Sequence, residues 1–130
     1  MDLGIPTLVE MKSIEEAAAF ASSLGFSFVE LNTNLPWCTT ENLQKADLGT
    51  LTSRYNIYFT IHADENLFFC DFSERVAKAH TQNMLDAIEL ASKNGIQMDK
   101  AELEVKAEAF ALNRGSRSAR CAEQFIKSLM

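Results

Sequence analysis

Three polar residues stand in or directly after stretches that are otherwise typical of buried strands. They are Glu30, His62 and Glu104, and the strands of a parallel sheet, which are buried on both faces, normally avoid such groups. An imidazole and two carboxylates can ligate a divalent cation such as Zn²⁺, Mn²⁺ or Mg²⁺. Beside such a metal, a carboxylate can take a proton from the carbon next to a polarised carbonyl. Alternatively, the carboxylates face solvent and His62 is a hydrogen-bonded loop residue, because three dispersed ligands have no spacing signature.

Other candidate side chains fall in the segments that follow the predicted strands. Asp64 follows the histidine closely enough to act as a general acid or base, or else it belongs to a solvated acidic loop. Asn32 and Trp37 come after the second predicted strand, where they could contact a small polar ligand. Arg114 and Arg117 precede a predicted helix, where arginines and free backbone amides can bind phosphate, with an ordinary surface loop as the alternative. The sequence has none of the P-loop, serine-hydrolase or zincin motifs.

The elements that would position these residues alternate regularly along the chain. Ser13 and Glu16 form a capping-box pattern before a helical run, and Gly25 and Gly95 stand where two helices should end. Residues 100–106 alternate like a strand, although their apolar spacing also fits a helix. The predicted strands span residues 3–9, 26–31, 57–61 and 100–106, and the predicted helices span 14–24, 41–55 and 74–94, with a last helix reaching Leu129.

This alternation predicts an α/β fold with a parallel sheet and right-handed crossovers. Such sheets bind ligands beyond the carboxyl ends of their strands. Neighbouring parallel strands lie about 4.8 Å apart, so we expect Glu30 and His62 within about 10 Å of one another at that edge.

The composition is that of one folded, acidic domain. The chain has 130 residues, of which 47% are hydrophobic and 23% charged, as in typical globular proteins. Its formal charge of −6 offers no general attraction to phosphate, so nucleic-acid binding is not expected. No apolar run is long enough to span a membrane and no segment resembles a secretory signal, so we expect a cytoplasmic protein without a membrane partner. Cys38, Cys70 and Cys121 include no C-x-x-C pair and suit reduced thiols.

Short motifs in the first 95 residues resemble those of a known superfamily. They are Leu3-Gly4-Ile5, Gly25-Phe26 leading to Val29-Glu30-Leu31, and Ile61-His62-Ala63. This pattern resembles the xylose-isomerase-like TIM barrels, which comprise sugar-phosphate isomerases and epimerases and also endonuclease IV. The resemblance implies a divalent-metal site at the carboxyl ends of the strands, with His62 matching the histidine that follows the third strand of the family.

The chain is too short for a complete barrel of that kind. Eight strand–helix units need at least about 200 residues, and 130 residues accommodate about four. Residues 102–105 are similar to the family's glutamate-bearing last strand. We therefore expect a (β/α)4 half-barrel with strand order 3-2-1-4, in which residues 1–95 form three units and residues 96–130 the last unit of a single domain. Its open inner face would carry Ile5, Phe28, Phe59 and Leu103 or their strand neighbours, and a homodimer would cover that face.

These inferences together predict a metal-dependent sugar or sugar-phosphate isomerase or epimerase. The expected partners are a small sugar-like ligand and a second copy of the chain. The alternative is a non-catalytic half-barrel that acts as an assembly or binding module, and endonuclease activity ranks third because the chain is acidic. The expected roles are Glu30 and Glu104 in catalysis, Asn32, Trp37, Arg114 and Arg117 on the substrate, and His62, Glu30 and Glu104 on the metal.

Overall fold

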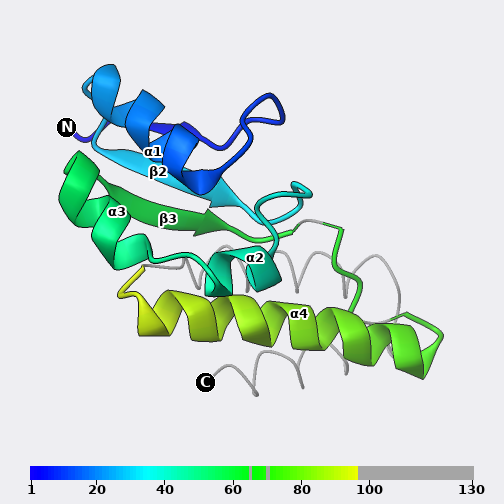
Figure 1. Cartoon of the computed structure of the whole chain (residues 1–130). Helices are drawn as coiled ribbons and strands as arrows, with labels where there is room; N and C mark the ends of the chain where they lie inside the picture. The colour runs from blue at the N-terminus through cyan, green and yellow to red at the C-terminus, as the bar shows by residue number, and fades with distance from the viewer. Residues whose placement is uncertain (65, 70, 97–130) are drawn as a thin grey trace. The chain divides into compact units, whose positions relative to one another are not determined.

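The computed structural model describes residues 1–64, 66–69 and 71–96 (Figure 1). These residues fall into two compact units, the first built from residues 1–66 and 86–96 and the second from residues 67–85. The sheet belongs to the first unit. In the part of the chain described here, no helix is both long and apolar enough to cross a membrane.

The sheet consists of three short parallel strands in the order β1-β2-β3. They are β1 (Gly4–Pro6), β2 (Phe28–Asn32) and β3 (Tyr58–His62). The register places Val29 opposite both Ile5 and Phe59, and it places Glu30 between Pro6 and Thr60. The first three predicted strands are therefore present, and β1 is shorter than expected. The strand predicted over residues 100–106 lies outside the described residues, so the half-barrel and its strand order stay predictions.

The helix α1 (Ile14–Ser23) begins where the sequence predicts. The backbone N–H of Glu16 donates to Ser13 Oγ at 3.1 Å, and Glu16 Oε2 accepts from the backbone N–H of Lys12 at 2.8 Å. The predicted capping pair is thus confirmed, with the carboxylate reaching one residue further back than in the usual capping box. At the other end Gly25 has a φ of +74°, which ends the helix in a left-handed residue.

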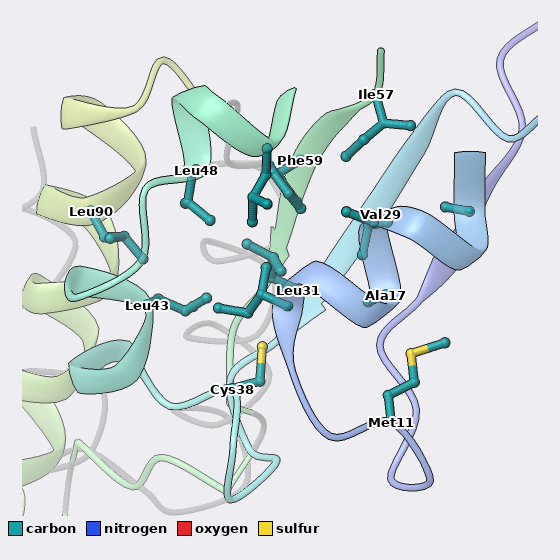
Figure 2. Close-up of a cluster of buried hydrophobic side chains, with 14 residues drawn as sticks. Met11, Ala17, Val29, Leu31, Cys38, Leu43, Leu48, Ile57, Phe59 and Leu90 are labelled. Atoms are coloured by element: carbon teal, nitrogen blue, oxygen red, sulfur yellow. The ribbon is translucent and has the colours of Figure 1, made fainter. Parts of the chain in front are cut away.

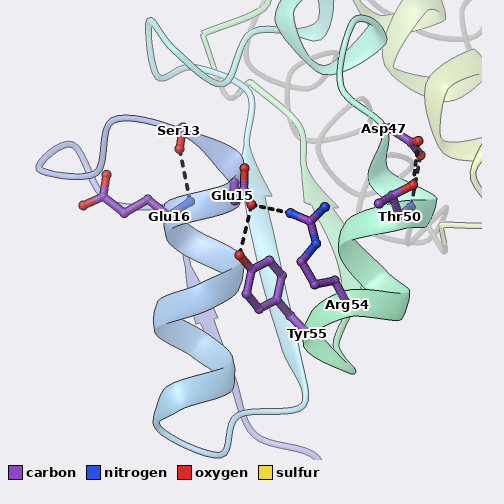
Figure 3. Close-up of polar contacts among 7 residues, drawn as sticks. All are labelled: Ser13, Glu15, Glu16, Asp47, Thr50, Arg54 and Tyr55. Atoms are coloured by element: carbon purple, nitrogen blue, oxygen red, sulfur yellow. Dashed lines mark hydrogen bonds and ion pairs between the residues drawn. The ribbon is translucent and has the colours of Figure 1, made fainter.

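The stretch 41–55, predicted as one helix, forms two helices. They are α2 (Thr40–Gln44), capped by Thr39, and α3 (Leu48–Tyr55), capped by Asp47. Asp47 accepts from the backbone N–H of Thr50 at 3.0 Å and from its hydroxyl at 2.6 Å (Figure 3). These bonds lower the pKa of the Asp47 carboxyl. An aspartate that bonds the backbone in this way favours a new helix start over helix continuation, and this explains the break.

The helix α4 (Glu74–Lys93) ends in the manner predicted from Gly95. Gly95 has a φ of +63°. Its N–H donates to the carbonyl of Ser92 at 3.4 Å, and the N–H of Ile96 donates to the carbonyl of Ala91 at 2.8 Å. This pair of bonds is a Schellman motif, which satisfies the last carbonyl groups of the helix and reverses the chain.

One face of the sheet packs against the helices of the first unit. Val29, Leu31 and Phe59 lie on this face and belong to a buried cluster shown in Figure 2. From the helices the same cluster receives Ala17, Ala18 and Ala21 of α1, Leu48 and Leu51 of α3, and Leu90 of α4. The small alanine side chains leave α1 close to the sheet, and the cluster forms the core that positions the strand ends.

The structure decides which residues occupy each face of the sheet. Ile5 and Phe59 or else their strand neighbours were expected on an open inner face, and Ile5 and Phe59 themselves pack with the helix-covered core. Phe28 does point to the other face. Side chains alternate between the two faces along a strand, so an error of one residue in the pattern assigns a side chain to the opposite face.

A polar cluster on the surface joins α1 to α3. Glu15 Oε1 lies 2.6 Å from Arg54 Nη1 and accepts from the Tyr55 hydroxyl at 3.0 Å (Figure 3). The Arg54 and Glu15 side chains are 55% and 54% exposed, so the ion pair adds little to stability.

Gly4 is needed because an aromatic ring occupies the place of its side chain. A Cβ at this position would overlap the ring of Phe28. That ring stacks on Tyr58 with a centroid distance of 5.2 Å, and the Tyr58 hydroxyl donates to Asp2 at 3.1 Å. The amino end of the second sheet face is therefore a fixed aromatic stack.

We expect Gly4→Ala to lower the free energy of unfolding by about 1–3 kcal/mol, because overpacking forces the ring out of its position. Gly49→Ala is the matched control, since a Cβ there meets only Asp47 Oδ1 at 3.6 Å. Urea denaturation of both variants measures the difference. In a Phe28→Ala background the cost of Gly4→Ala should largely disappear, and an unchanged cost would contradict the assignment.

Candidate functional site

The carboxyl edge of the sheet brings Glu30 and His62 together. They lie on β2 and β3, on the face that the helices of the first unit do not cover, and in diagonal register, because His62 is opposite Asn32 and Glu30 is opposite Thr60. Glu30 Oε1 is 3.7 Å from His62 Nδ1. The expectation that these two residues lie within about 10 Å of one another is confirmed.

The Glu30–His62 pair is accessible as well as close. The His62 side chain is 30% exposed and the Glu30 side chain 42%. A separation of 3.7 Å allows an ion pair when the imidazole is protonated, and it is too long for a strong hydrogen bond. The two groups can therefore exchange protons with a molecule placed beside them, one as a base and the other as an acid.

Backbone and hydroxyl hydrogen bonds fix the strand ends that carry this pair. The N–H of Thr7 donates to the carbonyl of Glu30 at 2.9 Å, and Thr7 Oγ1 accepts from the N–H of Asn32 at 2.9 Å. On the other side, the N–H and the hydroxyl of Thr33 both donate to the carbonyl of His62, at 3.3 and 3.2 Å. The residues after β1 and β2 thus hold Glu30 and His62 at the edge.

Sequence reasoning missed Thr7, which is 3% exposed and is the one buried polar side chain among the described residues. Its hydroxyl also hydrogen-bonds the thiol of Cys38. The sequence did contain a signal for this role, because Thr7 is a lone residue with a hydroxyl group in an apolar stretch and directly follows the proline that ends β1. Cys38 is a free, buried cysteine, and burial raises the pKa of its thiol to about 11, so it fits the structural role expected of it.

The other predicted site residues have mixed outcomes. Asn32 Oδ1 accepts from the N–H of Asn34 at 3.4 Å, which engages the side chain in a turn. Trp37 packs against the core, and its Nε1 is buried without a hydrogen-bond partner in the described part of the chain. Asp64 Oδ1 accepts from the N–H and the side-chain amide of Asn66, at 2.9 and 3.1 Å, so it organises its own loop. The predictions for Glu104, Arg114 and Arg117 lie outside the described residues.

The expected metal centre is only partly described. Among residues 1–64, 66–69 and 71–96, no three His, Cys, Asp or Glu side chains converge as ligands for one ion. Glu30 and His62 would supply two ligands, and the expected third, Glu104, lies in the segment that is not described. The metal stays a prediction.

Comparison with known proteins corrects the family resemblance. Residues 72–130 match the model of a family described as "Protein of unknown function (DUF815)", and this match covers less than half of the chain. No curated protein and no solved structure matches the chain. The resemblance to xylose-isomerase-like TIM barrels is therefore wrong. Its motifs, a glycine before a strand and a polar residue after one, are short and recur wherever parallel strands alternate with helices.

We expect Thr7→Val to lower the free energy of unfolding by about 1–3 kcal/mol, because it leaves the N–H of Asn32 without its acceptor and removes the hydroxyl that bonds the Cys38 sulfur. Thr7→Ser is the matched control, since it keeps the hydroxyl, and its cost should be smaller. Guanidinium denaturation measures both. Equal costs for Val and Ser would show that the methyl group of Thr7, rather than its hydroxyl, matters.

Proposed function

We propose that the carboxyl edge of the sheet binds a small sugar-like molecule and moves a proton at the carbon next to its carbonyl, as an isomerase or epimerase does. The observation that carries this proposal is the Glu30–His62 pair, with 3.7 Å between Oε1 and Nδ1. Two further facts support it. The pair lies at the strand ends where open parallel sheets bind ligands, and both side chains are part-exposed.

The two side chains would have different roles in this reaction. The Glu30 carboxylate takes the proton, because its oxygen atoms are acceptors. His62 donates a hydrogen bond or a proton to the carbonyl oxygen, where negative charge develops. A bound Zn²⁺, Mn²⁺ or Mg²⁺ would polarise the same oxygen, and one imidazole with one carboxylate is a donor set that suits Zn²⁺ or Mn²⁺ once a third ligand joins. A cytoplasmic location belongs to this proposal, and the free thiol of Cys38 is compatible with it.

Exchange of substrate hydrogen with solvent tests this function. The chain is incubated in D₂O with aldoses and ketoses, phosphorylated and unphosphorylated, with and without added Zn²⁺, Mn²⁺ or Mg²⁺, and proton NMR follows deuterium incorporation next to the carbonyl. We expect Glu30→Gln to slow exchange by about 10²–10⁴-fold. Glu41→Gln, which changes an exposed carboxylate at the start of α2, is the matched control and should exchange at the wild-type rate. Absence of exchange by the wild-type chain with every sugar and metal would overturn the proposal.

The alternative, an assembly module that forms a homodimer, is favoured by a different observation. Within the described sheet β1 and β3 are both edge strands, and an open edge can pair with another chain. Next to β1, Leu3 is 54% exposed and Val9 is 68% exposed. Exposed apolar residues beside a strand edge are typical of an interface.

Light scattering tests the homodimer. We expect a particle of twice the 14.5 kDa chain mass, because pairing along β1 would bury both the strand edge and its apolar neighbours. Leu3→Glu should shift the protein towards the monomer. Leu24→Glu, at a leucine that is 57% exposed after α1, is the matched control and should leave the mass unchanged. A wild-type monomer at micromolar concentration would contradict this function.

A further inference from the structure

A pocket of about 520 Å³ lies along the edge of β3. It is lined by Leu48, Gly49 and Thr52 of α3, by residues 58–60 of β3, and by residues 94–96 after α4. All of these residues belong to the first unit. Its size falls within the range of about 300–1,000 Å³ that is usual for small-molecule sites.

The backbone of β3 offers hydrogen-bonding groups to this pocket. The N–H of Tyr58 donates to the carbonyl of Ser27, and the carbonyl of His62 accepts from Thr33, so these alternate residues bond towards β2. In a parallel ladder the residues between them direct their N–H and C=O groups to the opposite side. The peptide groups of Phe59 therefore point away from β2, to the outer edge of the described sheet.

Tyr58 lines the pocket at the amino end of β3, and its ring is held in place. One neighbour of the ring is Phe28, with which it stacks at 24° between planes, and its hydroxyl donates to Asp2. Desolvation, together with Asp2, raises the pKa of Tyr58, so the phenol is neutral at physiological pH. A ring held in this way does not need to be ordered when a ligand binds, which favours affinity.

Among the described residues, the lining has no side chain that is charged at neutral pH. A charged ligand would lose water here without gaining a charge partner, whereas an apolar ring would not. Four of the described lining side chains are polar but neutral: Thr52, Tyr58, Thr60 and Asn94. The Tyr58 hydroxyl already donates to Asp2, and the Asn94 amide donates to the carbonyl of Leu90 at 2.9 Å. Among the described residues, the two threonine hydroxyls and the β3 backbone are the polar groups that a ligand can use.

From these observations we propose that the β3-edge pocket binds an uncharged small molecule that has an aromatic ring and one hydrogen-bonding group at its rim. The ring packs against the lining residues of α3 and the edge of β3. The rim group bonds to the Phe59 backbone or to a threonine hydroxyl. Neither Glu30 nor His62 lines this pocket, although Glu30 is opposite Thr60 in the sheet, so binding here does not depend on proton transfer at that pair.

Fluorine NMR with two small probes tests the pocket in the full chain. 4-Fluorophenol is neutral at pH 7 and 4-fluorobenzoate is its charged counterpart. We expect 4-fluorophenol to bind with a dissociation constant of about 1 mM, as suits so small a ligand, and 4-fluorobenzoate to bind at least about tenfold more weakly. Equal binding of the two probes, or binding of neither, would overturn the proposal.

Variants of α3 locate the binding. Gly49→Leu places a large side chain at the pocket wall, and Ser53→Leu places the same side chain on an exposed part of the same helix as the matched control. We expect Gly49→Leu to weaken 4-fluorophenol binding about tenfold or more and Ser53→Leu to leave it unchanged, with circular dichroism showing that both are folded. If Gly49→Leu does not fold, Thr52→Trp fills the pocket from the next turn. Unchanged binding in the filled variant would refute the site, whereas Glu30→Gln should bind the probe normally whatever its effect on exchange.

Discussion

The structure depends on one packing constraint, the contact between the alanine face of α1 and the apolar face of the sheet. Ala17, Ala18 and Ala21 are fully buried, as are Val29 and Leu31 of β2. Once Val29 and Leu31 are committed to the core, the pleat of the strand turns Glu30 to the opposite face. The polar pair at the sheet edge thus follows from the hydrophobic pattern of its own strands, because burial of one set of residues exposes the other.

The face of the sheet opposite the helices of the first unit has an apolar part and a polar part. At the amino end, Phe28 lies over Gly4 and stacks on Tyr58, so this part is apolar and closely packed. At the carboxyl end, Glu30 and His62 are part-exposed. A rigid aromatic end leaves the strands little freedom to shift in register, since a shift would separate the ring from the glycine that accommodates it. The position of the polar end is therefore fixed by packing about two residues away on the same strands.

The sequence predicted most of this arrangement where the physical signal was local. The Ser13–Glu16 pair and the two terminal glycines defined helix ends, because capping depends on a few neighbouring residues. The break at Asp47 was missed, since an aspartate within a helical pattern is compatible with either continuation or a new start. The sequence left open whether Ile5 and Phe59 or their strand neighbours face the helices, because a short apolar run does not show which of its two faces is covered. The family resemblance failed for a related reason. Three short motifs are typical of strands in many parallel sheets, and they do not identify one protein family.

Cys38 has a consequence for how motions of this protein can be observed. Its side chain is fully buried, and burial raises its thiol pKa to about 11, so the thiol stays protonated at neutral pH. A maleimide or disulfide reagent can reach it only when the segment between β2 and α2 opens. In a chain whose other cysteines are replaced, the rate at which Cys38 is labelled thus measures how often the carboxyl edge of the sheet opens locally.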